Sequence, residues 1–252
     1  IAAHVRFGTS VSLDGDTLVV GCLNYNGDWG GAAYVFTRSV AGSLNSAWIQ
    51  RARLLAHDRA SYDLFGLSVA VNGDTVVVGL PSNHGNRISS NGGAAYIFTR
   101  DSAGVLSSSW SQQYKLESTP DKSSGDRFGV SVAVDGQNIA VGSQREDAFG
   151  ADAGAVYIFL RNHQTNINSP WTLARTIGSS HASANSYFGI AISMKGSALV
   201  AGMPGLESGV TGRSVVIYTT ACDASVAPTN GGVGDCTSTL ASGSTCQPTC
   251  IS

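Results

Sequence analysis

The chain has 252 residues, a formal net charge of -2 and a hydrophobic fraction of 42%. Its basic residues form no cluster, which argues against a nucleic-acid partner because phosphate binding requires a basic patch. No apolar run approaches the roughly 18 residues that span a bilayer, so we expect no membrane insertion in this segment.

One sequence motif recurs four times and organises the chain. The copies begin at Phe-Gly pairs about 60 residues apart, at Phe7, Phe65, Phe128 and Phe188. The second copy reads FGLSVAVNGDTVVVGLPSNHGNRISSNGGAAYIFTR. A tryptophan and a weakly apolar run follow the first three copies, at Trp48, Trp110 and Trp171. The repeat therefore extends beyond the Phe-Gly motif itself.

Each copy predicts a tight hairpin followed by two more strands. In the second copy, residues 67–71 and 75–80 are rich in small and β-branched side chains. The turn at 72–74, Asn-Gly-Asp, suits a two-residue hairpin loop, which needs φ > 0 and favours Asn, Asp and Gly. Residues 94–99 and 110–116 predict the third and fourth strands. We expect two buried strands, a third of mixed burial and a more polar fourth strand at the edge.

Alternation along the third strand predicts which side chains share a face of the sheet. Tyr96 and Phe98 should lie on one face, and Ala95 and Ile97 on the other. A single four-stranded sheet cannot bury both of its faces, and stacking the next sheet on it completes the core. Four such units with no helical period favour an all-β fold, a β-propeller, over a β-sandwich with accidentally similar halves.

The motif resembles the FG-GAP repeat of integrin-α-type β-propellers. The resemblance rests on FG-x-S-V-A, then V-V-G-x-P, then G-A-A-Y-I-F, and it covers residues 7 to about 220. It implies a β-propeller domain of four-stranded blades at residues 1–220. Rings of this type have seven blades, so four copies leave three arrangements open: half of a larger ring, an unusually small closed ring of four, or an open arc completed by a neighbouring chain.

The resemblance also raises the question of calcium. Integrin-type repeats often hold calcium in the first hairpin, where several carboxylates converge on one cation. The turns here, such as 72–74, are too short to wrap an ion, so we expect no cofactor at them. A weaker candidate for a metal site is the acidic loop of the third copy, with Glu146, Asp147 and Asp152. Clustered carboxylates on a loop are more often simply solvated.

The residue types that enzymes use for catalysis form no recognisable pattern. Ser10, Ser68 and Ser131 recur after Phe-Gly, but the fourth copy has Ala191 and no nucleophile elbow surrounds them, so we expect small packing residues. The five histidines show no metal-ligand spacing. The Gly-Gly pairs open strands rather than helices, so they offer no helix N-terminus to a phosphate. We therefore expect a protein that is not an enzyme.

Two aspartates, Asp63 and Asp126, stand two residues before Phe. One interpretation makes them ligands on a recognition face. The other makes them caps, because aspartate commonly accepts hydrogen bonds from nearby backbone N–H groups in a turn. We favour the capping role.

The C-terminal residues 221–252 differ from the repeats in composition. They are rich in Gly, Ser and Thr and contain four cysteines, Cys222, Cys236, Cys246 and Cys250. This density indicates a disulfide-stapled module in an oxidising compartment, and three pairings remain open. The segment resembles the opening of Cys-rich modules of algal and protist surface proteins, which implies an extracellular or cell-surface location and an incomplete module. Cys22 is separate from these four cysteines and lies at the end of a predicted strand, where we expect a buried free thiol.

The resemblance implies where a partner would bind. In propellers of this family, the loops between second and third strands share one face with the loops that lead into Phe-Gly. We expect contact loops at 24–30, 82–91, 144–152 and 205–211, and within them we single out Tyr25, Asp28, Trp29, His84, Arg87 and Glu207. The aromatic residues are the best anchors because such rings dominate interface energetics.

Our functional prediction is an extracellular, non-enzymatic structural or adhesion domain of a larger cell-surface or filament-forming protein. Its partners would be other protein chains, including copies of itself. One alternative is a glycan-binding propeller, in which Trp29 would stack on a sugar beside Asp28. A second alternative is a domain that accompanies a hydrolase. The chain has no Asn-x-Ser/Thr sequon, and its Ser/Thr-rich tracts leave O-glycosylation open.

Overall fold

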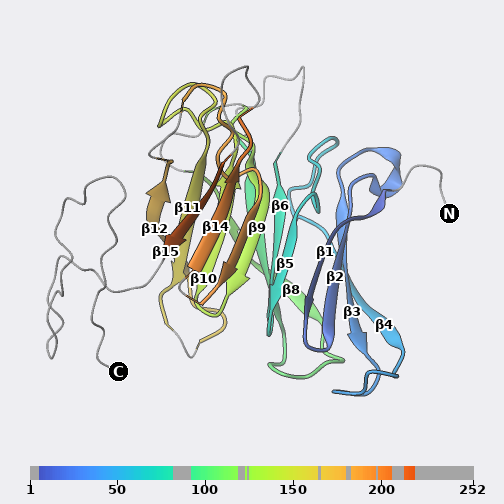
Figure 1. Ribbon diagram of the computed structural model, residues 1–252. Coiled ribbons are helices and arrows are strands. Elements are labelled where there is room, and N and C mark those ends of the chain that lie inside the picture. Colours follow the sequence, from blue (N-terminus) through green and yellow to red (C-terminus); the bar gives the residue numbers. More distant parts are fainter. Residues whose placement is uncertain are drawn as a thin grey trace, which may run out of the picture.

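The computed structural model describes residues 6–81, 92–118, 123, 125–163, 166–179, 183–196, 198–205 and 213–218. Its strands form four antiparallel sheets, one for each sequence copy (Figure 1). Sheet 1 contains β1 (Phe7–Asp14), β2 (Thr17–Cys22), β3 (Ala32–Arg38) and β4 (Trp48–Leu54). Sheet 2 contains β5 (Val69–Asn72), β6 (Thr75–Leu80), β7 (Ala94–Arg100) and β8 (Trp110–Leu116). Sheet 3 contains β9 (Phe128–Asp135), β10 (Asn138–Ser143), β11 (Ala155–Arg161) and β12 (Trp171–Ile177).

Sheet 4 contains three strands within the described residues, β13 (Ile192–Lys195), β14 (Ala198–Met203) and β15 (Arg213–Tyr218). In every sheet the strands follow chain order, so each strand pairs with its neighbour in sequence. The predicted hairpin of the second copy is confirmed, with Asn72 paired to Thr75 across the turn. Four-stranded units are confirmed for the first three copies, consistent with the blades of a propeller.

The sheets stack face against face in sequence order (Figure 1). Three hydrophobic clusters fill the spaces between them. The predicted faces of the third strand of sheet 2, β7, are confirmed. Tyr96 and Phe98 belong to the cluster shared with sheet 1, whereas Ala95 and Ile97 belong to the cluster shared with sheet 3. The prediction of mixed burial for this strand is wrong, because β7 is buried along its whole length. Sheet 2 has a sheet on each side, so neither face of β7 meets solvent.

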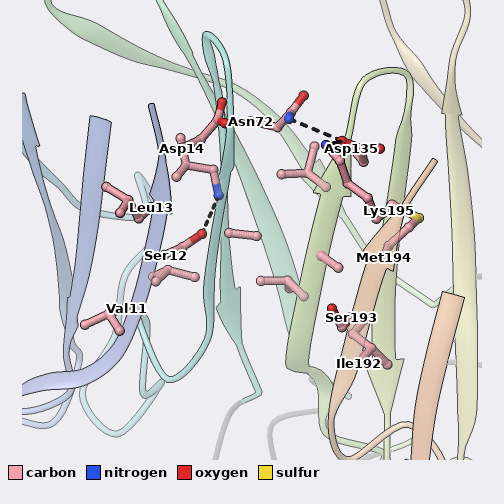
Figure 2. Close-up of a pocket in the computed structure, with 16 residues that line it drawn as sticks. Val11, Ser12, Leu13, Asp14, Asn72, Asp135, Ile192, Ser193, Met194 and Lys195 are labelled. Atoms are coloured by element: carbon pink, nitrogen blue, oxygen red, sulfur yellow. Dashed lines mark hydrogen bonds and ion pairs between the residues drawn. The ribbon is translucent and has the colours of Figure 1, made fainter. Parts of the chain in front are cut away.

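The innermost strands, β1, β5, β9 and β13, line a cavity of about 420 Å³, and Figure 2 shows their side chains around it. Polar contacts at the hairpin turns join successive sheets along one end of this cavity. The Asp14 carboxylate accepts a hydrogen bond from the Gly73 N–H at 2.6 Å, and Asp135 accepts one from the Gly196 N–H at 2.6 Å. Each turn therefore docks on the turn of the next sheet.

The two ends of the stack are not joined in the described residues. Val11 and Leu13 on β1 are 66% and 63% exposed, and Val200 on β14 is 40% exposed. A closed ring of four would bury these side chains between sheet 4 and sheet 1. Closure of a ring is therefore not shown in the described residues, and the three arrangements left open by the sequence stay predictions.

Cys22 is buried and forms no disulfide within the described residues, as predicted, and burial raises the pKa of its thiol. The four cysteines of the C-terminal segment, Cys222, Cys236, Cys246 and Cys250, lie outside the described residues, so the predicted disulfides and the domain boundary near 220 stay predictions. Within the described ranges, no helix has the length and apolar character that crossing a membrane requires.

Candidate functional site

At one rim of the stack, the loops after the second strands of sheets 1 and 3 bond to the loops that lead into the Phe-Gly pairs of sheets 2 and 4. The family resemblance implies this pairing, and the other two expected contact loops, 82–91 and 205–211, lie almost wholly outside the described residues. Between sheets 1 and 2, the Tyr62 N–H donates to the Asp28 carbonyl at 3.0 Å. Between sheets 3 and 4, the Asn185 N–H donates to the Ala151 carbonyl at 2.9 Å. Backbone hydrogen bonds therefore join neighbouring sheets at this rim in both of these places.

Trp29 lies on this rim in the loop between β2 and β3. Its backbone has a φ of 60°, which is uncommon for a non-glycine residue, and its N–H donates to the Asn24 side-chain oxygen at 3.2 Å. The indole is half-buried, and the Arg6 guanidinium lies over it, 4.6 Å from the ring centroid. This distance is within the range of a cation–π interaction.

Tyr25 begins the 3-10 helix η1 (Tyr25–Gly27) in the same loop, and two arginines lie against its half-buried ring. The Arg53 guanidinium is 4.7 Å from the ring centroid and the Arg59 guanidinium is 5.8 Å from it. Arg53 comes from the end of β4, and Arg59 from the loop leading into sheet 2. The fold thus brings cations from three separate segments onto two aromatic rings of the same loop.

Asp28 fixes the loop from within. Its carboxylate accepts hydrogen bonds from the Gly30 N–H at 2.9 Å and from the Arg59 guanidinium. Burial alone would raise the pKa of the Asp28 carboxyl, but these two donors outweigh burial and hold the pKa below its ordinary value. Arg59 also donates to the Gly31 carbonyl at 3.2 Å. The Asp28 carboxylate is therefore largely engaged inside the protein.

We call Tyr25, Trp29, Arg6 and Arg53 the rim patch. Asp28 and Arg59 form an ion pair, so their charges balance each other. The exposed charges of the rim patch are the guanidinium groups of Arg6 and Arg53. Trp, Tyr and Arg are the residue types enriched at binding hot spots. The sequence singled out Tyr25, Asp28 and Trp29, whose role as contact residues stays a prediction, and it gave no sign of the arginines, which are separated from them in the chain.

Three other predicted contact residues, His84, Arg87 and Glu207, lie outside the described residues. The acidic loop of the third copy is described, and the carboxylates of Glu146 and Asp147 accept hydrogen bonds within the protein. Glu146 is 3% exposed and accepts a hydrogen bond from the Tyr157 hydroxyl at 2.6 Å. Asp147 accepts one from the Asp152 N–H at 2.7 Å. The described residues contain no group of three His, Cys, Asp or Glu side chains placed to hold a metal ion, so the structure gives this metal site no support.

The capping role of the two aspartates before Phe-Gly is confirmed. Asp63 accepts a hydrogen bond from the Ala60 N–H at 2.6 Å, and Asp126 accepts one from the Ser123 N–H at 2.7 Å. Both aspartates are buried. Burial raises the pKa of Asp126 to about 6, and the nearby negative charge of Glu146 adds to the rise.

The recurring serines have a role that the sequence did not show. Ser68 was expected to be a small packing residue, but its hydroxyl donates to the Gly129 carbonyl of the next sheet at 2.9 Å. Ser10 and Ser131 donate in the same way to Gly66 and Gly189, at 2.8 and 2.6 Å. In the sequence, each copy that carries the serine is followed by a copy that begins with a Phe-Gly pair. The hydrogen bond between the two becomes evident only when the sheets are stacked.

Comparison with known protein families identifies the repeat. A family model described as FG-GAP repeat matches residues 1–36, 48–98 and 110–159, more than half of the chain. No curated protein matches the chain significantly. Such repeats occur in extracellular or surface proteins, typically mediate protein–protein interactions and are typically non-catalytic. The stacked four-stranded sheets agree with the family match. This chain belongs to the FG-GAP repeat family.

Proposed function

We propose that this protein is an extracellular, non-catalytic adhesion or scaffolding module that binds a protein partner through the rim patch. The observation that carries the proposal is the pairing of two half-buried aromatic rings with guanidinium groups on a loop fixed by hydrogen bonds. Membership of the FG-GAP family supports an adhesion-type role. The four C-terminal cysteines support an oxidising compartment and a link to a larger surface or filament-forming protein.

The patch is suited to binding because its side chains are already ordered. Tyr and Trp have few rotatable bonds, and both rings here are held in place by arginines and by the backbone of the loop. A binding surface that is ordered beforehand loses less conformational entropy when a partner docks. The exposed guanidinium groups of Arg6 and Arg53 can each donate two hydrogen bonds to one carboxylate, in a bidentate geometry. We therefore propose a partner with acidic side chains.

The geometry favours a protein partner over a sugar. Stacking on a sugar requires an open ring face, and the Arg6 guanidinium lies over the indole of Trp29. In that alternative the Asp28 carboxylate would bond a sugar hydroxyl, and it already accepts hydrogen bonds from Arg59 and the Gly30 N–H. The glycan-binding alternative keeps Trp29 as its anchor and is separated from our proposal by the test below.

The test measures binding of the purified chain to three immobilised probes: Asp/Glu-rich peptides, the same peptides with Asn/Gln, and a panel of neutral glycans. We expect salt-sensitive binding to the acidic peptides that weakens at least about tenfold in Trp29→Ala and in Arg53→Ala. Leu44→Ala, on a β3–β4 loop outside the rim patch, is the matched control and should bind normally. Glycan binding that depends on Trp29, without peptide binding, would replace our proposal with the lectin alternative.

A further inference from the structure

The third strand ends with an arginine in sheets 1, 2 and 3: Arg38, Arg100 and Arg161. Each guanidinium lies over the tryptophan that begins the next strand, at 4.6, 4.5 and 4.6 Å from the ring centroid. Each backbone N–H donates at 3.0 Å to the carbonyl of the residue after the hairpin glycine, which is Asp16, Asp74 or Gln137. The three arginines are therefore held in the same way and can be compared directly.

In sheet 2, every nitrogen of the Arg100 guanidinium has an acceptor. Its Nε donates to the Asp74 carboxylate at 2.6 Å, and its Nη1 donates to the Val105 carbonyl at 3.1 Å. Its Nη2 donates to the Thr17 hydroxyl of sheet 1 at 3.0 Å. The Asp74 carboxylate thus balances the charge of an arginine that is only 3% exposed.

Arg161 of sheet 3 has no carboxylate in this place, because the corresponding residue is the neutral Gln137. Its Nη2 donates to the Thr75 hydroxyl of sheet 2 at 2.8 Å, but its Nε is buried without a hydrogen-bond partner. Among the described residues Arg161 forms no ion pair, and residues 162–170 include no Asp or Glu. Unlike Arg100, Arg161 is partly exposed, so a small solute can approach it.

The energetics of this arginine favour uptake of an anion. Burial lowers the pKa of the Arg161 guanidinium, and the group that opposes this effect is the Tyr114 hydroxyl rather than a carboxylate. An arginine keeps its proton in proteins, so it cannot relieve the cost by becoming neutral. A buried donor without an acceptor and a desolvated charge without a counter-charge both destabilise the folded state. A bound anion would remove both costs.

We propose that Arg161 binds a small carboxylate-type anion where sheets 2 and 3 meet, in the position that the Asp74 carboxylate takes beside Arg100. The ligand carries one negative charge, because one aspartate balances one arginine in sheet 2, and in sheet 1 Asp16 lies 3.4 Å from Arg38 Nε. The anion stabilises the contact between the sheets, because it holds the guanidinium that donates to Thr75.

This site is separate from the rim patch. Gln137 directly precedes the second strand of sheet 3, β10, whereas the rim loops follow the ends of the second strands. The two sites therefore lie at opposite ends of the strands, and the inference does not depend on the proposed function.

The test follows the Nε–H resonance of Arg161 by NMR while sodium formate is added to the full chain. Loss of the signal in Arg161→Lys assigns the resonance. We expect a saturable downfield shift with a millimolar Kd, as one charge-assisted contact in water would give. The Nε–H resonance of Arg100 should not move, because Asp74 already occupies its acceptor position.

Gln137→Asp is the matched variant, because it supplies the carboxylate that Asp74 supplies in sheet 2. It should weaken formate binding at least about tenfold by occupying the site. Gln137→Asn stays neutral and should keep the formate response. Salt effects that are unrelated to the site would act equally on all three chains.

A second probe, the amide of N-acetyl-aspartate, distinguishes a free anion from the side chain of a protein partner. A response to formate alone identifies a free anion as the ligand, and a response to both probes shows that the site also admits a protein carboxylate. Either response supports the proposal. The proposal is overturned if neither probe shifts the Arg161 resonance, or if Gln137→Asp responds to formate as strongly as the original chain.

Discussion

The hydroxyl of Ser68 and the carbonyl of Gly129 are 61 residues apart in the chain and 2.9 Å apart in space. This hydrogen bond ties sheet 2 to sheet 3 directly beside the buried ring of Phe128. The same tie occurs at each joint between sheets. The serine and the Phe-Gly pair that recur along the chain therefore connect neighbouring sheets, in addition to forming part of each sheet.

Removal of the hydroxyl tests the contribution of this tie. Ser131→Ala leaves the buried Gly189 carbonyl without its 2.6 Å donor, so we expect a loss of about 1–2 kcal/mol in the free energy of unfolding. Urea denaturation measures the change. Ala191→Ser is the matched control, because no further sheet in the described residues offers it an acceptor, and it should change stability by less than about 0.5 kcal/mol.

Gly79→Ala tests how closely the sheets must approach. The new Cβ would be 2.0 Å from the Gly129 carbonyl oxygen and would force sheets 2 and 3 apart. We expect a destabilisation of about 3 kcal/mol or more, seen as a marked drop in melting temperature. Gly202 is the corresponding residue of sheet 4. A Cβ there would lie 3.7 Å from its nearest neighbour, the Ala191 carbonyl oxygen, so Gly202→Ala should be tolerated. Equal effects of the two substitutions would contradict the role of the joint.

Gln137→Asp should stabilise sheet 3. In sheet 2, Asp74 accepts a hydrogen bond from Arg100 Nε at 2.6 Å, and the corresponding residue in sheet 3 is Gln137. Arg161 Nε is buried there without a hydrogen-bond partner. A carboxylate at 137 would supply one, and charge-assisted hydrogen bonds contribute about 1.5–3 kcal/mol. Differential scanning calorimetry should show a higher melting temperature, with Gln137→Asn, which has no charge, showing no comparable gain.

Asp126 makes stability depend on pH between about 4 and 6. Its pKa rises to about 6 in the folded protein, mainly through burial, while an unfolded aspartate titrates near 3.9. In that window the folded state binds more protons than the unfolded state, so the contribution of this group to stability falls as pH rises and stays low above pH 6.

Asp126→Asn removes this titration while keeping an acceptor for the Ser123 N–H. We expect urea denaturation to show the variant about 1–2 kcal/mol more stable than the original chain near pH 7.5, and a flatter stability profile between pH 4 and 6. An unchanged slope across that window would show that Asp126 titrates in the folded protein as it does in the unfolded chain.

The amino-acid sequence determined the local structure of each repeat. The Asn72–Gly73 turn, the β-branched run at Thr75–Leu80 and the alternation of Tyr96 with Ile97 were sufficient to predict the hairpin, the strands and the two faces of β7. These features depend on turn geometry and on the twofold period of side chains along a strand, which act between residues close together in the chain.

Only the tertiary structure decided what lies at the joints and at the rim. Arg6 and Arg53 reach Trp29 and Tyr25 from separate segments, and Ser68 finds its acceptor in another sheet. The exposure of Val11 beside the burial of its counterpart Val69 likewise depends on which sheet lies next to it. These contacts form between residues of different sheets or loops. They depend on which sheets lie next to each other, and the side-chain pattern within one repeat does not specify them.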